Sequence, residues 1–129
     1  MLLNLSDVSN ESLQAQIIRQ VRAKILNGSL PAGEALPSIR GLARDTHVSV
    51  ITVQRAYEFL EREGLIYSRR GKGFFISEIE QERKLEMAEN KVSESLYPVL
   101  EAAITEGIDK DDLLRLVEQM IKKINQTFE

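Results

Sequence analysis

Apolar residues near the start of the chain recur at the spacing of an amphipathic helix. The pattern predicts a helix over residues 11–27, with Asn10 or Ser12 as its N-cap and Gly28 at its C-terminal end. Its apolar face repeats at intervals of four residues, at Leu13, Ile17, Val21 and Ile25. The following segment, 28–37, contains two glycines and two prolines, so we expect a loop there.

A helix-turn-helix pattern follows this loop. Two helices are predicted over 39–46 and 49–63, joined by a tight turn. Ser38 and Ser49 can cap them, because a serine oxygen accepts hydrogen bonds from the free N–H groups of a first turn, and Gly64 ends the second helix. The inward face of that second helix consists of Val53, Ala56, Tyr57 and Leu60. Its outward face consists of Ile51, Gln54, Arg55 and Glu58.

The next segment has the pattern of a β-hairpin. Two short β-prone runs, 65–68 and 74–77, flank the stretch Arg69-Arg70-Gly71-Lys72-Gly73. Two glycines among three cations predict a tight, basic tip whose backbone can approach another molecule closely.

The last third of the chain returns to a helical pattern. A helix is predicted from about residue 78, with Pro98 expected to kink or divide it and Gly107 to end it. Asp109 then caps a final helix. The stripe of the first of these helices comprises Leu85, Ala88, Val92, Leu96, Val99, Leu100, Ala103 and Ile104. That of the final helix comprises Leu113, Val117, Met120, Ile124 and Phe128, with Leu114 and Ile121 alongside.

These elements predict a mostly α-helical fold with a small β-hairpin. We expect a winged helix-turn-helix domain over 1–78 and a two-helix segment over 79–129. The charge is divided in the same way. The formal net charge of −3 is the sum of +2 over residues 1–78 and −5 over residues 79–129. A basic first part and an acidic second part suggest two different roles.

Composition excludes several classes of function for the 129 residues. Cysteine is absent, which excludes disulfides, thiol nucleophiles and cysteine-ligated metals, and histidine occurs once, which excludes a multi-histidine site. No apolar run approaches the roughly 20 residues of a membrane helix, and the N-terminus lacks the pattern of a signal peptide. We therefore expect a cytoplasmic protein.

The sequence also lacks the pattern of an enzyme. His47 and Asp45 form the only local acid–base pair, and at a spacing of two residues they do not face each other on a helix. Asp109, Asp111 and Asp112 open a helix, where acidic residues are expected as caps and dipole partners rather than as metal ligands. We predict neither enzymatic activity nor a cofactor.

The helix predicted over 49–63 has the residues of a DNA-reading helix. The second helix of a helix-turn-helix enters the major groove, where Gln54 can pair with adenine and Arg55 with guanine or phosphate. Val50 and Ile51 also face outward, and a thymine methyl group is a suitable partner for either of them.

At this point the residues resemble those of a known family. The segments Leu36-Pro37-Ser38-Ile39-Arg40, Leu42-Ala43, Val48-Ser49, Thr52-Val53-Gln54-Arg55-Ala56-Tyr57, Leu60-Glu61-Arg62-Glu63-Gly64-Leu65-Ile66 and Arg69-Arg70-Gly71-Lys72-Gly73 are similar to the GntR family of bacterial winged-helix repressors. The resemblance covers roughly residues 11–77, and the short remaining tail is similar to the YtrA-type branch, which ends in two helices. Val50 and Ile51 depart from the polar or basic residues that many relatives carry there, so base preference does not transfer.

The resemblance implies a role for each matching position. Arg40 matches an arginine that contacts DNA, residues 49–52 match the start of the recognition helix, and Gly71 matches a wing glycine that enters the minor groove. The complete predicted DNA-binding set is Ser38, Arg40, Ser49, Val50, Ile51, Thr52, Gln54, Arg55, Arg69, Arg70, Gly71 and Lys72.

The two C-terminal helices predict a dimer. Their apolar stripes are too extensive for one pair of helices to cover, and a second copy is the simplest cover. The predicted interface comprises Leu85, Val92, Leu96, Val99, Leu100, Ile104, Leu113, Val117, Met120, Ile121, Ile124 and Phe128. Folding of these helices back onto the winged domain is the alternative. The tail is too short for the effector domain of larger relatives, so a small ligand would sit at the dimer interface or between domains.

Two functional hypotheses follow. The first is a homodimeric repressor that binds double-stranded DNA at an inverted repeat, with half-sites about 34 Å apart or on a related spacing. The resemblance to the YtrA-type branch implies transporter genes as its targets. The alternative is a winged-helix protein-interaction module that does not bind DNA by itself, which the overall negative charge favours and the basic wing disfavours.

Overall fold

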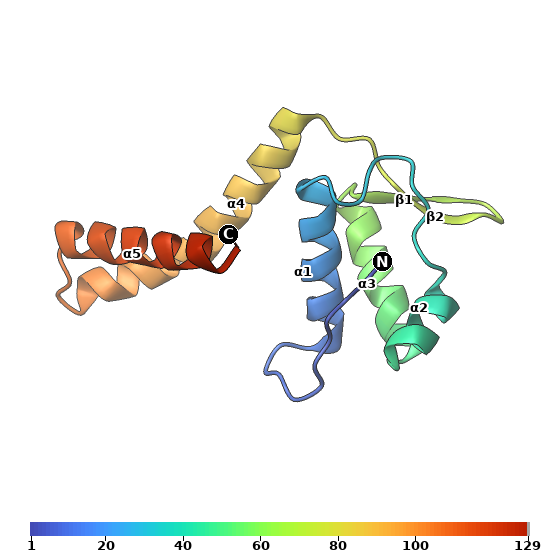
Figure 1. Ribbon diagram of the computed structural model, residues 1–129, viewed down its shortest axis with the longest axis horizontal. Helices are drawn as coiled ribbons and strands as arrows, with labels where there is room; N and C mark the ends of the chain where they lie inside the picture. Colours follow the sequence, from blue (N-terminus) through green and yellow to red (C-terminus); the bar gives the residue numbers. More distant parts are fainter. Residues whose placement is uncertain (129) are drawn as a thin grey trace. The chain divides into compact units, whose positions relative to one another are not determined.

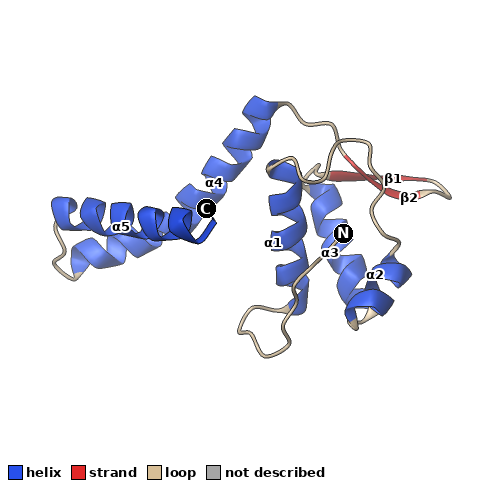
Figure 2. Cartoon of the chain, in the orientation of Figure 1, coloured by secondary structure: helices blue, strands red, loops and turns tan. Residues whose placement is uncertain are grey.

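The computed structural model describes residues 1–128, which form five α-helices and one two-stranded antiparallel sheet (Figures 1 and 2). The helices are α1 (Leu13–Leu26), α2 (Ile39–Thr46), α3 (Val50–Arg62), α4 (Gln81–Thr105) and α5 (Lys110–Phe128), and the strands are β1 (Ile66–Arg69) and β2 (Gly73–Ile76). The mostly helical class with a small hairpin is thereby confirmed. Among residues 1–128, no helix combines the length and the apolar character needed to cross a membrane.

The chain divides into two compact units. The first is Met1–Leu85 and the second begins at Glu86, inside α4, so the first turn of that helix belongs to the first unit. The division therefore falls later in the chain than the expected boundary after residue 78.

Serine caps begin the three helices of the first unit, as the sequence predicts. The hydroxyl oxygens of Ser12, Ser38 and Ser49 accept hydrogen bonds from the backbone N–H groups of the residues three positions ahead, at 3.0, 3.0 and 3.1 Å. Ser12, and not Asn10, is the cap of α1. Gly28 and Gly64 follow the ends of α1 and α3 in the left-handed conformation that glycine adopts most readily.

The core of the first unit lies between the apolar faces of α1 and α3 and the inner side of the sheet. Its largest fully buried side chains are Tyr57, Ile17, Ile25, Leu60, Leu65, Ile66, Ile76, Val21 and Val53. Leu42 and Ala43 of α2 are buried as well, whereas Ile39 is only partly buried.

The segment 28–37 is a loop that pairs with the edge of the hairpin. Ala35 forms an isolated bridge with Phe75, and the N–H of Leu36 donates to the carbonyl oxygen of Phe74 at 2.9 Å. The N–H of Ile76 donates in turn to the carbonyl oxygen of Glu34. The segment is therefore a loop, as expected, and it also supplies hydrogen-bond partners to the free edge of β2.

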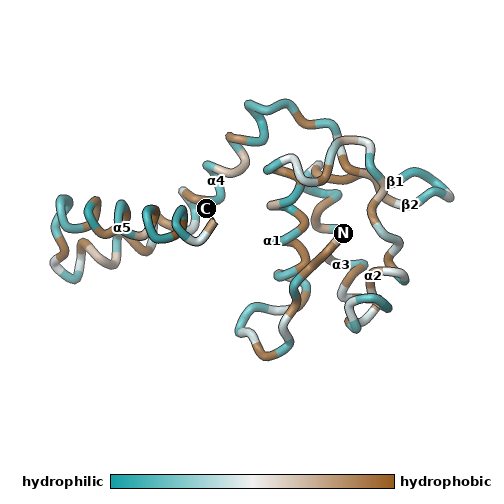
Figure 3. Tube along the Cα trace, in the orientation of Figure 1, coloured by the Kyte–Doolittle hydropathy of each residue, from teal (hydrophilic) through white to brown (hydrophobic). Residues whose placement is uncertain are grey.

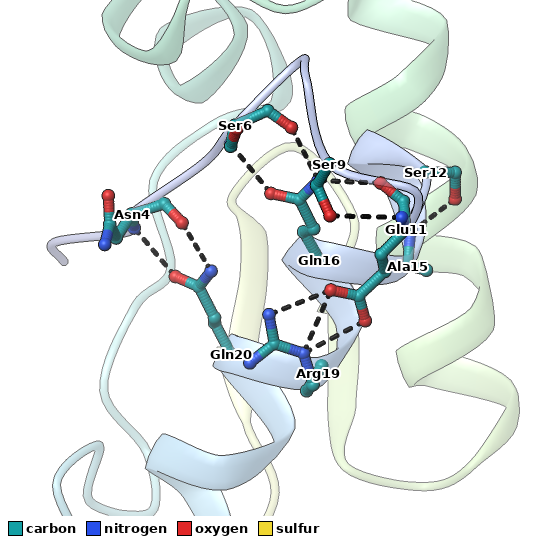
Figure 4. Close-up of polar contacts among 9 residues, drawn as sticks. All are labelled: Asn4, Ser6, Ser9, Glu11, Ser12, Ala15, Gln16, Arg19 and Gln20. Carbon is teal, nitrogen blue, oxygen red and sulfur yellow. Dashed lines mark hydrogen bonds and ion pairs between the residues drawn. The ribbon is translucent and has the colours of Figure 1, made fainter.

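An N-terminal segment lies along α1 and is held there by two glutamine side chains (Figure 4). The Gln16 amide accepts from the N–H of Ser6 at 2.8 Å and donates to the carbonyl oxygen of Ser6 at 2.7 Å, and the Gln20 amide makes the same pair of bonds with Asn4. Four residues of helix advance about 6 Å, and two residues of extended chain advance about 6.5 Å. One helix face can therefore hydrogen-bond alternate residues of the segment. We call this arrangement the amide clamp.

The second unit contains the rest of α4 together with α5. Helix α4 runs unbroken through Pro98, so the expected division did not occur. Proline removes one N–H donor, and the carbonyl that loses it lies in an exposed stretch of the helix, where water can replace the donor. Asp109 caps α5 as predicted, its carboxylate accepting from the N–H of Asp112 at 2.9 Å. Each turn of α5 contains both apolar and polar residues, so the two kinds recur along the helix (Figure 3).

We expect Gln16→Ala to lower the free energy of unfolding by about 1–3 kcal/mol, because Gln16 is 2% exposed and its loss leaves backbone groups of Ser6 and Glu11 without partners. Chemical denaturation measures the change. Gln14→Ala is the matched control, since Gln14 lies on the same helix and makes no side-chain hydrogen bond within residues 1–128. Equal stability of the two variants would contradict a structural role for the amide clamp.

Candidate nucleic-acid interface

Helix α3 has one face in the core and the opposite face in solvent. Val53, Ala56, Tyr57 and Leu60 are all 0% exposed, as the sequence predicts. The predicted DNA-reading residues Val50, Ile51, Gln54 and Arg55 are exposed, while Thr52 is half-buried. In the view of Figure 1, α1 lies to one side of α3, and α2 and the tip of the hairpin lie to the other.

The turn that leads into α3 is tight and locally ordered. His47 ends α2 in the left-handed conformation, with φ of 58°, and the N–H of Val48 donates to the carbonyl oxygen of Ala43 at 3.1 Å. Ser49 then caps α3 and its hydroxyl lies 2.7 Å from that of Thr52. The N–H groups of Val50 and Ile51 make no hydrogen bond within residues 1–128, so they can bind a phosphate oxygen.

The polar side chains of the outward face differ in whether they already make a hydrogen bond within the protein. The Gln54 amide nitrogen donates to the Glu58 carboxylate at 3.1 Å, which orients the amide and leaves its oxygen and one N–H available. Arg55 makes no ion pair with any described residue, and neither does Arg40 at the start of α2. Both guanidinium groups can therefore bind an anion or a base edge without breaking an internal contact.

The predicted hairpin is present, with each strand shifted by one residue from the expected range. Ile66 pairs with Ile76 and Arg69 with Gly73. The N–H of Lys72 donates to the carbonyl oxygen of Arg69 at 2.9 Å, which closes the turn. Gly71 sits in this turn at φ of 73°, a conformation that a side chain strongly disfavours, and nothing lies within 4 Å of where its Cβ would be.

The three cations of the hairpin are not equivalent. The Arg69 guanidinium lies over the ring of Phe75, 5.4 Å from its centroid, so it is partly engaged with the protein. The side chains of Arg70 and Lys72 are exposed and make no hydrogen bond or ion pair among the described residues. We call the turn Arg69–Gly73 the wing tip.

Tyr57 links α3 to the segment that precedes α2. Its hydroxyl donates to the carbonyl oxygen of Pro37 at 2.8 Å, next to the cap Ser38. Burial raises the pKa of Tyr57, so the hydroxyl stays protonated and able to donate. Its ring also meets Phe74 of β2 edge to face, with the centroids 5.2 Å apart.

Glu61 links α3 to the hairpin. Its carboxylate accepts from both the N–H and the hydroxyl of Ser68 in β1, at 3.0 and 2.8 Å. Neither this role of Glu61 nor that of the Tyr57 hydroxyl was predicted from the sequence. A buried tyrosine predicts some partner for its hydroxyl, but the sequence does not indicate which residue supplies it.

The structure thus positions the predicted residues on three neighbouring elements without joining them directly. Residues 49–55 share the start of α3, Ser38 and Arg40 lie at the start of α2, and Arg69–Lys72 form the wing tip. No hydrogen bond or ion pair among residues 1–128 joins the wing tip to the outward face of α3. Tyr57 and Glu61 determine the spacing between these elements.

A helix-turn-helix followed by a two-stranded wing defines the winged-helix class of DNA-binding domains. Comparison with known proteins specifies the family. Residues 13–76 match the family of bacterial regulatory proteins named gntR. The chain is 30% identical over 119 residues to the HTH-type transcriptional repressor YtrA of Bacillus subtilis strain 168, which covers 92% of each chain. The chain therefore belongs to the GntR family, whose members are DNA-binding transcriptional regulators and not enzymes, so the family resemblance found in the sequence is confirmed.

Solved structures agree with this assignment over nearly the whole chain. A GntR family transcriptional regulator from Listeria monocytogenes has a TM-score of 0.72 at 30% identity, covering 89% of this chain and 98% of that one. YtrA from Sulfolobus acidocaldarius, a GntR-family transcription factor, has a TM-score of 0.55 at 26% identity, covering 95% of this chain and 99% of that one. The similarity thus extends to the two-helix tail.

We expect Tyr57→Phe to lower the free energy of unfolding by about 1 kcal/mol, because it removes one hydrogen bond and leaves the Pro37 carbonyl without its donor. Thermal or chemical denaturation measures the loss. Tyr67→Phe is the control, since Tyr67 is 40% exposed and its hydroxyl makes no hydrogen bond within residues 1–128. If both variants were as stable as the wild type, the Tyr57–Pro37 link would contribute nothing to the fold.

Proposed function

We propose that this protein is a homodimeric transcriptional repressor that binds an inverted-repeat operator. In this proposal α3 enters the major groove of each half-site, and Gly71 of the wing tip enters the minor groove. One observation carries the proposal: the outward face of α3, the start of α2 and the wing tip all present exposed side chains that include unpaired cations. Three arginines there, Arg40, Arg55 and Arg70, make no ion pair among the described residues.

Each part of this surface has a distinct contribution. Arg40, Arg69, Arg70 and Lys72 supply the charge that phosphates attract, and Gln54 and Arg55 supply the groups that recognise adenine and guanine edges. Ser38, Ser49 and Thr52 are at helix starts, where hydroxyl and N–H groups can approach the backbone.

The second unit supports the dimer through apolar side chains that a single chain leaves in solvent. Nine of the proposed interface residues are at least 36% exposed: Leu85, the last residue of the first unit, and, in the second unit, Val92, Leu96, Val99, Ile104, Met120, Ile121, Ile124 and Phe128. The other three, Leu100, Leu113 and Val117, are half-buried in one chain. A second copy would cover the exposed set, because solvent contact with so many apolar residues is unfavourable.

The dimer proposal also accounts for the uneven charge. The acidic second part would carry the pairing surface, while the basic first part would face DNA. The regulator would act in the cytoplasm on genes for membrane transporters, the targets that resemblance to the YtrA-type branch implies. A small effector, where one exists, would bind at the dimer interface or between the domains.

Selection from a pool of random DNA duplexes tests the proposal as a whole. We expect the wild-type protein to enrich an inverted repeat, because a two-fold dimer presents two reading helices related by symmetry. Enrichment of one half-site would contradict the symmetric dimer. Absence of any sequence enrichment would contradict the operator-binding function and favour a protein-interaction module.

We expect Arg70→Ala and Arg40→Ala to weaken binding to the selected duplex and to reduce the slope of log Kd against log salt concentration by about one per lost phosphate contact. Fluorescence anisotropy titrations at several salt concentrations measure both quantities. Arg115→Ala is the control for the change in charge, since Arg115 lies on α5 and pairs with Asp112 at 3.0 Å. If Arg115→Ala weakened binding equally, the assignment of phosphate contacts to Arg40 and Arg70 would be wrong.

We expect Ile124→Glu to separate the dimer, because it places a charge in a surface that the partner would bury. Sedimentation velocity should show a dimer for the wild type and a monomer for the variant. Gln119→Glu adds the same charge on the opposite side of α5, where we expect the dimer to persist. A monomeric wild type at micromolar concentration would overturn the dimer proposal.

A further inference from the structure

The first turn of α3 presents an apolar pair where a DNA-reading helix usually presents hydrogen-bonding groups. Val50 is 42% exposed and Ile51 is 49% exposed, and they occupy the first two positions of the helix. The core does not need them, because the inward face of α3 is filled by four residues that are completely buried.

The hydroxyl groups near this pair are engaged with each other. Ser49 and Thr52 are 2.7 Å apart, and the Ser49 hydroxyl also accepts from the N–H of Thr52. The polar groups that could read bases therefore begin one turn later, at Gln54 and Arg55. The side chains of the first two helical residues offer only aliphatic surface, beside two free backbone N–H groups.

Helical geometry gives the two aliphatic residues different positions. Ile51 lies on the same face as Arg55, four residues further on, and is three residues from Gln54, so it is central in the reading face. Val50 is followed at the same spacings by buried Val53 and exposed Gln54, so it lies at the edge of that face. Ile51 is thus placed to contact a base edge, and Val50 is placed to contact a neighbouring base.

Resting on the proposed function, we propose that Val50 and Ile51 read C5-methyl groups of pyrimidines, with Ile51 the principal contact. The C5-methyl group is the apolar feature of a base edge in the major groove, and thymine carries it. Aliphatic side chains cannot hydrogen-bond the O4 atom of thymine, so the methyl group itself is what they recognise. 5-Methylcytosine carries the same methyl group beside an amino donor, and it should be accepted at these positions.

Exchange of single bases in the selected duplex separates methyl recognition from hydrogen bonding. Replacing the thymine opposite Ile51 with deoxyuridine removes one methyl group and keeps O4, and we expect Kd to rise about fourfold from the transfer free energy of a buried methyl-sized group. Replacing the same thymine–adenine pair with a 5-methylcytosine–guanine pair keeps the methyl group, and we expect Kd within about twofold of the original. Unmethylated cytosine–guanine should bind as weakly as the deoxyuridine duplex.

Protein variants assign the effect to these side chains. Ile51→Ala should bind the thymine duplex several-fold more weakly and should not distinguish thymine from deoxyuridine, and Val50→Ala should show a smaller effect of the same kind. Both sites are exposed and alanine favours helices, so circular dichroism should show unchanged folding. Val8→Ala, which truncates a 90% exposed valine outside α3, is the control and should retain full discrimination.

The outcomes distinguish this inference from the proposed function. If wild-type protein binds the selected duplex but tolerates deoxyuridine at every thymine, methyl recognition is wrong while operator binding stands. If Ile51→Ala still discriminates deoxyuridine, the methyl group is read by another residue and the assignment is wrong. If no duplex is selected at all, the operator-binding function fails, and the inference fails with it.

Discussion

The complete burial of one face of α3 is the constraint on which the first unit depends. Val53, Ala56, Tyr57 and Leu60 have no solvent exposure, and they pack against residues of α1, α2 and the sheet. Because a helix that buries one face must present the other, the same packing that stabilises the core orients Gln54 and Arg55 outward. The orientation of the reading face is therefore a direct result of core packing.

Two side chains on α3 extend this constraint to the rest of the surface. Tyr57 connects the helix to the Pro37 carbonyl and to Phe74, and Glu61 connects it to Ser68. The hydrogen bonds of both residues go to backbone groups or to the short side chain of Ser68, which have little freedom to move. The start of α2 and the wing are thereby positioned by the helix whose outward residues they flank. A pre-ordered surface of this kind loses less conformational entropy when it binds.

Much of this architecture was accessible from the sequence because it depends on neighbouring residues. Serine caps, glycines after helices and the repeats of apolar residues predicted all five helices and the hairpin with small errors at their ends. The pairing of Ala35 with Phe75 and the links from Tyr57 and Glu61 were not predicted, because they join residues that only the fold brings together. The amide clamp of Gln16 and Gln20 was missed for the same reason. Of the two outcomes expected at Pro98, a kink or a division of the helix, the division did not occur, because water can replace the lost donor in an exposed helix.

The division of α3 into a buried and an exposed face also affects how such a regulator can evolve. Val50, Ile51 and Arg55 are exposed and contribute little to the core, so substitutions there need not reduce folding stability. If these residues choose the operator, as the proposed function holds, a duplicated gene could exchange them and acquire a new operator while the scaffold stayed intact. Selection can then act on target choice and on protein stability almost independently, which allows a genome to hold many paralogues with one architecture and separate sets of regulated genes.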